Sequence, residues 1–310
     1  MSDASGVFYR GVMSQGNLQL DGITKSYGTR QVLDNLSFSV ARGHLTGFVG
    51  GNGAGKTTTM RIILGLLSSD GGRVTLDGAD VTPEMRRNFG YMPEERGLYP
   101  KMKTLEQVAY FARLHGYSKA ESTERAAALL EELGLGERLN DNIEALSLGN
   151  QQRAQVATSL VHDPQVLILD EPFSGLDPLA VDTVAAVLQQ RAARGVSVLF
   201  SSHQLDVVER LCDDVVILAD GRIRAAGDRE ELRAQHSAPR WELSSSGDAG
   251  WLRDEPGVTV VDFEAGNAIF DVDDDEVAQR VLRRALTDGA VTHFAPQRPT
   301  LAQIFKEVIR

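Results

Sequence analysis

Residues Gly50 to Thr57 have the types and the spacing that suit a chain of phosphates. They read GGNGAGKT and fit the pattern G-x-x-x-x-G-K-[ST] at every fixed position. Glycines let backbone N–H groups turn inward around a β-phosphate, and a helix that begins there points its positive end at the anion. We expect Lys56 to bridge the β- and γ-phosphates, the Thr57 hydroxyl to ligate Mg²⁺, and Thr58 to lie near the α-phosphate. The predicted nucleotide-binding loop comprises Gly50, Gly51, Asn52, Gly53, Ala54, Gly55, Lys56, Thr57 and Thr58.

Two adjacent acids further along the chain could serve a metal ion and an attacking water. Asp170 and Glu171 lie at the end of the apolar run VLILDEP, which predicts a buried strand. Asp170 at a strand end can hold Mg²⁺ through water, and Glu171 can polarise the water that attacks a phosphate. Two acids at an exposed strand end are common in isolation, so the phosphate loop upstream is what favours the catalytic interpretation.

The segment from about Leu18 to Arg233 resembles the ATP-binding cassette family, with six motifs in that family's order. LSLGNQQR, residues 146–153, is similar to the family signature, which is usually LSGGQ followed by QQR. SGLDP, residues 174–178, matches the loop after the catalytic glutamate, and SSHQLDVVERLCD contains the candidate switch histidine, His203.

The resemblance implies hydrolysis of ATP with Mg²⁺ as cofactor, and it adds residues to the site. Glu171, His203 and Lys56 are the implied catalytic residues. Tyr27, in ITKSYGTRQVL, matches the aromatic residue that stacks on adenine, and Asp177 is a further implied nucleotide contact.

The signature has a physical logic of its own. Ser147 is a good N-cap for the helix that LGNQQRAQVATSLV predicts, and Gly149 lets a bare N–H approach an anion. In the family this second phosphate receptor contacts the γ-phosphate of ATP held by the other subunit, which implies a head-to-tail homodimer that sandwiches two ATP molecules. Leu148 and Asn150 replace the usual glycine and glutamine. We expect a working receptor, because Ser147 and Gly149 remain.

The stretch YMPEERGLYP, residues 91–100, places carboxylates unexpectedly close in sequence to a phosphate site. It resembles the family's Q-loop, where the residue after the proline is usually glutamine, and here that residue is Glu94. Mg²⁺ prefers oxygen ligands, so we expect Glu94 to join Asp170 and Thr57 as a metal ligand, with Glu171 close by. The alternative is that Glu94 points to solvent. Glu95 is expected on a solvated or partner-facing surface.

The elements that must position these residues alternate between strand-like and helix-like segments, which indicates an α/β fold. HLTGFVG, QVLILD and VSVLFSS are apolar runs typical of strands buried on both faces, and KTTTMRIILGLL has helical spacing. Residues 104–134 predict an inserted pair of helices. We therefore expect a flexible leader at 1–16 and a nucleotide-binding ATPase domain at 17–236, with a helical subdomain at about 95–163.

Residues 237–310 are expected to form a small α+β accessory domain. RWELSS, VTVVDFE, NAIFDV and AVTHFAP predict strands, with Gly266-Asn267 between the second and third. DAGWLRDEP and DEVAQRVLRRALTDG predict helices, so the order is the βαββαβ order of a ferredoxin-like unit. TLAQIFKEVIR predicts a closing helix.

Composition narrows the classes of function. The net charge of −11 argues against a large sequence-independent contact with nucleic acid, and the accessory domain, with 13 acidic against 8 basic residues, repeats this bias. No run of eighteen apolar residues predicts a membrane span, and the N-terminus lacks the pattern of a secretory signal. The single cysteine, Cys212, excludes an internal disulfide.

The favoured function is that of the ATP-hydrolysing subunit of a transporter. Its C-terminal organisation resembles bacterial export ATPases for drugs, antibiotics or sodium. That resemblance implies separate transmembrane permease subunits and a peripheral place on the cytoplasmic face of the bacterial membrane. The alternative is a soluble cassette ATPase that acts on ribosomes or DNA, although the chain lacks the second cassette or long coiled-coil insertion of such proteins.

Overall fold

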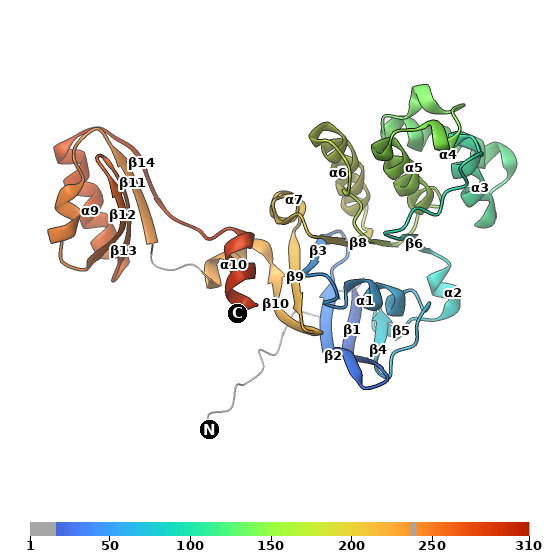
Figure 1. Ribbon diagram of the computed structural model, residues 1–310, viewed down its shortest axis with the longest axis horizontal. Helices are drawn as coiled ribbons and strands as arrows, with labels where there is room; N and C mark the ends of the chain where they lie inside the picture. Colours follow the sequence, from blue (N-terminus) through green and yellow to red (C-terminus); the bar gives the residue numbers. More distant parts are fainter. Residues whose placement is uncertain (1–16, 237–239, 310) are drawn as a thin grey trace. The chain divides into compact units, whose positions relative to one another are not determined.

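The computed structural model describes residues 17–236 and 240–309, and the chain divides into two compact units, Met1–Gly227 and Asp228–Arg310 (Figure 1). The expected leader, residues 1–16, lies outside the described residues. So do residues 237–239, where the accessory domain was expected to begin. Within the described part of the chain, no helix combines the length and apolar character needed to cross a membrane.

The first unit contains a six-stranded sheet that positions the predicted chemistry. Its strand order is β10-β9-β3-β8-β7-β6, and β3 pairs in parallel with both β8 and β9. The apolar runs predicted as strands are present, and all residues of β3, β7 and β8 are buried. The bounds are β3 (Leu45–Gly50), β6 (Phe89–Met92), β7 (Val166–Leu169), β8 (Ser197–Ser202), β9 (Asp214–Ala219) and β10 (Arg222–Asp228).

A second, antiparallel sheet in the same unit has the order β2-β1-β4-β5. Its strands are β1 (Leu18–Tyr27), β2 (Arg30–Val40), β4 (Gly71–Leu76) and β5 (Ala79–Asp80). Helix α1 (Lys56–Ile63) lies between the two sheets (Figure 1). Its Met60 and Ile63 belong to the same apolar core as Leu18 and Phe38 of the antiparallel sheet and Phe48 of the parallel one. This core fixes the start of α1 at the end of β3.

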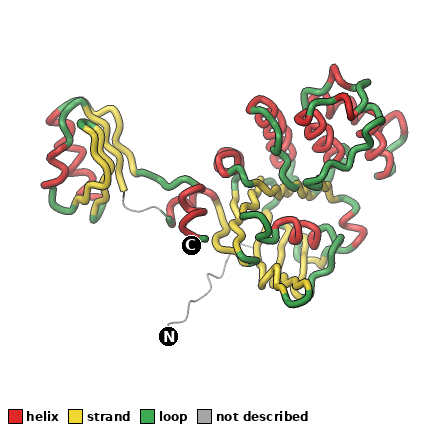
Figure 2. The backbone as a smooth tube through the Cα atoms, in the orientation of Figure 1, coloured by secondary structure: helices red, strands yellow, loops and turns green. Residues whose placement is uncertain are grey.

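The predicted helical block is present (Figure 2). Helix α4 begins with a complete capping box between Ser118 and Glu121, and α5 begins at the N-cap Ser147, as expected. The block consists of α3 (Thr104–Leu114), α4 (Lys119–Glu132), α5 (Leu148–Leu160) and the 3₁₀ turns at Gly136–Arg138 and Ile143–Ala145. The remaining helices of the unit are α2 (Pro83–Arg86), α6 (Pro178–Ala193) and α7 (Leu205–Leu211).

The second unit confirms the ferredoxin-like topology. Its antiparallel sheet has the order β12-β13-β11-β14, and the apolar side of α9 packs on it through Val277 and Val281, in one core with Phe270. The first predicted helix is only a 3₁₀ turn at Gly250–Asp254, because the Asp248 carboxylate accepts the Gly250 N–H and Pro256 soon follows. The bounds are α8 (Arg229–Gln235), β11 (Arg240–Ser245), β12 (Val258–Glu264), β13 (Asn267–Val272), α9 (Asp275–Asp288), β14 (Val291–Pro296) and α10 (Leu301–Val308).

Candidate functional site

The loop between β3 and α1 has a backbone that depends on glycine. A Cβ atom on Gly50 would lie 2.5 Å from the Leu218 carbonyl oxygen, and one on Gly55 would lie 2.5 Å from Leu33. Gly55 also has φ = 113°, a left-handed conformation that favours glycine. It is the N-cap of α1 but makes no side-chain cap, and the first turn of α1 carries no acid. The helix N-terminus therefore presents backbone N–H groups to an anion.

Two polar side chains at the start of α1 have defined partners. The Lys56 ammonium donates to the carbonyl oxygens of Gly50 at 2.7 Å and Gly51 at 3.4 Å, so it lies against the loop. The Thr57 hydroxyl donates to Asp170 Oδ2 at 2.8 Å, which joins the loop to the end of β7. The structure thus brings together residues that are 113 positions apart in the chain.

Asp170 and Glu171 form the next part of the site. Asp170 is 1% exposed, and its second carboxylate oxygen accepts the Ser201 hydroxyl at 2.5 Å. Glu171 has φ = 54°, an unusual value for a residue with a side chain, and its N–H donates to Ser201 Oγ at 2.9 Å. Its carboxylate lies 2.9 Å from His203 Nδ1. The expected catalytic acid and switch histidine are therefore in direct contact at the end of β8.

These residues fit a magnesium ion. The Thr57 hydroxyl and the Asp170 carboxylate place two oxygen ligands side by side next to the phosphate loop, and Mg²⁺ prefers oxygen. In the part of the chain that the structure describes, no three His, Cys, Asp or Glu residues are grouped so as to hold a metal. Glu94 is exposed, so its predicted contact with the metal stays a prediction.

Tyr27, the candidate base-stacking residue, ends β1 and is 52% exposed. The Lys25 ammonium lies 5.7 Å from the centre of its ring. Asp70 holds this end of β1 in place, since its carboxylate accepts the Lys25 ammonium at 2.8 Å and the Ser26 N–H at 2.6 Å. The hydrogen bond from Lys25 lowers the pKa of Asp70, with help from the Ser26 N–H. Gly28, at φ = 59°, makes the tight turn into β2.

The signature residues lie at the first turn of α5. Ser147 Oγ accepts the Asn150 N–H at 3.3 Å, and a Cβ atom on Gly149 would lie 3.5 Å from the Gly175 carbonyl oxygen. These contacts go to α5 and to the loop before α6, not to the phosphate loop. Asp177 is exposed, and its carboxylate caps α6 by accepting the Ala180 N–H at 2.9 Å.

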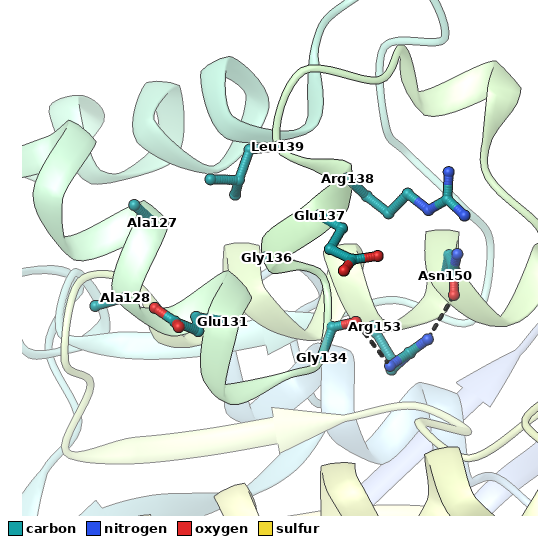
Figure 3. A pocket seen from close by; sticks show the side chains of 10 residues that line it. All are labelled: Ala127, Ala128, Glu131, Gly134, Gly136, Glu137, Arg138, Leu139, Asn150 and Arg153. Atoms are coloured by element: carbon teal, nitrogen blue, oxygen red, sulfur yellow. Dashed lines mark hydrogen bonds between the residues drawn. The ribbon is translucent and has the colours of Figure 1, made fainter.

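A surface pocket of about 770 Å³ lies beside the signature, between α4, the turn that follows it and the start of α5 (Figure 3). Arg153 donates to Asn150 Oδ1 at 2.5 Å and to the Leu133 carbonyl oxygen at 2.8 Å. The arginine thereby ties the first turn of α5 to the end of α4. None of the expected nucleotide contacts lines this pocket.

Two residues of this neighbourhood were missed by sequence reasoning. Ser201 contacts both Asp170 and Glu171, and the Gln152 amide donates to the Glu171 carbonyl oxygen at 2.9 Å. Ser201 lies in the SSH triplet before His203, so its place at a strand end was the available signal. Gln152 lies in the QQR that follows LSLGN, but nothing in the pattern shows what it contacts.

Comparisons with known proteins identify the family. The ABC transporter family model matches residues 33–174, and the model for the C-terminal domain of DrrA1-3-like ATP-binding proteins matches residues 227–309. The uncharacterized ABC transporter ATP-binding protein YhaQ of Bacillus subtilis (strain 168) is 36% identical over 292 residues, which cover 94% of this chain and 98% of YhaQ. The linearmycin resistance ATP-binding protein LnrL of the same organism is 35% identical over 218 residues, which cover 69% of this chain and 70% of LnrL.

Among solved structures, cbiO1 from Clostridium perfringens, described as part of the ABC transporter complex cbiONQ, superposes with a TM-score of 0.65 and 26% identity. The match covers 72% of this chain and 92% of cbiO1. The chain therefore belongs to the ABC transporter family, as its motifs predicted. Within that family it is an ATP-binding subunit with a DrrA-like C-terminal domain, an ATPase whose hydrolysis is coupled to transport.

Proposed function

We propose that this chain hydrolyses MgATP as one of two identical copies and powers export of a drug, antibiotic or ion. The single observation that carries the proposal is the set of contacts where β3, β7 and β8 end. There the Thr57 hydroxyl donates to Asp170, and the adjacent Glu171 contacts His203. This places a candidate water-activating carboxylate directly beside a candidate metal site.

Each residue then has a defined task. Lys56 contacts the β- and γ-phosphates, while the loop N–H groups and Thr58 surround the phosphate chain. Glu171 accepts a proton from the attacking water, and His203 orients the carboxylate. Thr57 and Asp170 would hold Mg²⁺, which would neutralise charge on the phosphates. Glu94, in the loop after β6, would be a further oxygen ligand.

We propose that the signature serves a second copy of the chain. Ser147 and Gly149 form a helix N-terminus free of acidic residues in its first turn, which suits a γ-phosphate. Because their contacts do not lead to the phosphate loop of the same chain, the partner's nucleotide is the fitting ligand. Two ATP molecules are then sandwiched in a head-to-tail homodimer, with Asp177 near the same junction.

The loop after β6 suits contact with a membrane-spanning partner. Tyr99 is 56% exposed, and its ring meets that of Tyr110 edge-on at 6.5 Å between centroids. Leu98 and Met102 are half-buried beside it in sequence. We propose that this loop receives a cytoplasmic helix of a separate permease subunit, which places the chain peripherally on the cytoplasmic face of the membrane.

Export is supported by the C-terminal region and by one relative. The match to the DrrA1-3-like domain covers nearly all of the proposed accessory domain, residues 237–310, which follows the proposed ATPase domain at 17–236. LnrL, named for linearmycin resistance, shares the cassette. No observation favours the alternative of action on ribosomes or DNA.

Co-purification tests the proposal most simply. The tagged chain, expressed in its own host and extracted in mild detergent, should bring down a hydrophobic multi-span protein. Tyr99→Ala should weaken that association while ATPase activity of the isolated protein stays within about twofold of the parent. Recovery of ribosomal RNA in place of a membrane protein would contradict the transport role.

A further inference from the structure

The helix that begins at the signature also reaches the candidate catalytic acid. Gln152 lies in the second turn of α5 and is 3% exposed. Its side-chain amide donates to the carbonyl oxygen of Glu171 at 2.9 Å and to that of Pro172 at 3.2 Å. One buried amide therefore joins α5 to the two peptide groups that follow Glu171.

The backbone of Glu171 needs such support. Its φ of 54° lies in the left-handed region, which is strained for a residue with a side chain and persists only when neighbours fix it. Three groups do so: Ser201 Oγ accepts its N–H at 2.9 Å, and its carbonyl oxygen accepts the Ser174 N–H at 3.2 Å and the Gln152 amide. Gln152 is the member of this set that comes from the signature helix.

Other hydrogen bonds also join α5 to neighbouring segments of the chain. Gln155, also 3% exposed, donates to the carbonyl oxygens of Pro93 at 2.7 Å and Glu95 at 3.3 Å. Arg153 ties the same helix to the Leu133 carbonyl oxygen. A displacement of the first turn of α5 would therefore move the segments around Glu171 and Pro93, because side chains of α5 are hydrogen-bonded to both.

We propose that Gln152 is a positioning residue that couples the signature to Glu171 within one chain. When the nucleotide held by a second copy contacts Ser147 and Gly149, α5 takes a fixed position, and Gln152 sets the Glu171 peptide and hence its carboxylate. This inference rests on the proposed roles of Glu171 and the signature. It adds a path by which one ATP site controls the catalytic acid of the other.

Gln152→Leu tests the proposal, because leucine has a similar size but no donor. We expect kcat for ATP hydrolysis to fall about 10- to 100-fold, as for other misplaced catalytic groups. KM for ATP and the protein concentration that gives half-maximal specific activity should stay within about twofold, since nucleotide binding and dimerisation do not use this amide. Gln152→Asn, one methylene shorter, should behave alike if the leucine variant fails to fold.

Thr158→Val is the matched control. It removes another buried polar group of α5, whose hydroxyl donates to the Gln155 carbonyl oxygen within the same helix, and it should keep the parental kcat. A parental kcat for Gln152→Leu would overturn the inference. So would an equal loss in the control, or a shift of the half-maximal concentration in place of kcat. Glu171→Gln, assayed in parallel, separates the two failures. An inactive Glu171→Gln enzyme beside a fully active Gln152→Leu enzyme would refute the inference and leave the proposed function standing, whereas an active Glu171→Gln enzyme would refute the proposed function on which the inference rests.

Discussion

Buried carboxylates occur in both units, but the side chains that pair with them differ. In the second unit Glu255 accepts hydrogen bonds from Arg280 at 2.9 Å and Arg284 at 3.0 Å, so positive charge compensates it. In the first unit Asp170 accepts from two hydroxyl groups, and no lysine or arginine among the described residues pairs with it or with Glu171. A buried charge without a partner is costly. The comparison fits a structural role for Glu255 and supports the proposal that Asp170 serves a cation.

The backbone conformations of Glu255 and Glu171 also differ. Glu255 has φ = −79° and ψ = 122°, an ordinary extended conformation, whereas Glu171 is left-handed at φ = 54°. Strained backbone clusters at functional sites, where the surrounding structure holds it in place. Glu171 thus has no lysine or arginine partner within the described part of the chain, and its backbone is strained. Glu255, in contrast, has two arginine partners and an unstrained backbone.

The largest effect should come from neutralising Asp170. Asp170→Asn keeps the shape of the side chain but removes the charge that attracts Mg²⁺. We expect ATP hydrolysis to fall at least about 100-fold and the Mg²⁺-dependent gain in ATP affinity to be largely lost. Phosphate release and ATP titrations with Mg²⁺ or EDTA measure both. A variant that keeps the full gain would show that Asp170 does not serve the metal.

The opposite behaviour is expected of Glu255. Glu255→Gln should lower the free energy of unfolding of the second unit by about 1–2 kcal/mol, because the partner arginines are half exposed and their loss of a counter-charge is screened. ATP affinity and hydrolysis should not change. Urea unfolding of the full chain reports the first effect. Loss of ATPase activity at unchanged stability would break the distinction between the two carboxylate sites.

Asp70 provides a smaller, more selective test within the first unit. Asp70→Ala removes the hydrogen bonds that hold Ser26 and Lys25 beside Tyr27, so ATP should bind about three- to tenfold more weakly. Tripolyphosphate, which has no base to stack on Tyr27, should bind unchanged. Asp21→Ala, which removes an exposed acid of β1 paired with Arg73, is the control. Equal weakening of both ligands would mean that Asp70 supports the phosphate loop instead.

Glu94 should show the smallest effect, because its side chain is exposed. Glu94→Gln should strengthen ATP binding in EDTA by about two- to threefold, since one negative charge near the phosphates is removed, and should reduce the gain on adding Mg²⁺. Isothermal titration under both conditions measures this. If the parent and the variant have the same affinities in both, Glu94 is not a metal ligand.

Local patterns were enough to predict much of the fold. Apolar runs located β3, β7 and β8, and the N-cap Ser147 located the start of α5. The antiparallel sheet was not predicted, because β1 pairs with β4 across about fifty residues, and no local pattern shows which distant strands pair. The turn before β13 is Ala265-Gly266, with Asn267 already in the strand, a shift of one residue that only the pairing decides.

The site was predictable to the extent that its residues lie in contiguous motifs. The phosphate loop and the pair Asp170–Glu171 carry their chemistry in adjacent positions, so spacing was informative. Ser201 and Gln152 act on Glu171 from 30 and 19 residues away. Such contacts depend on how β7, β8 and α5 pack together. No spacing pattern in the sequence predicts them.

Glu171→Gln tests the central claim most directly. The substitution removes the proton acceptor but keeps the size of the side chain, so turnover should fall at least about 100-fold while ATP affinity stays within about twofold. With Mg²⁺ and ATP the variant should accumulate as a stable dimer, measured by size-exclusion chromatography with light scattering on the sample used for the phosphate-release assay. Parental rates of phosphate release from Glu171→Gln would contradict the account.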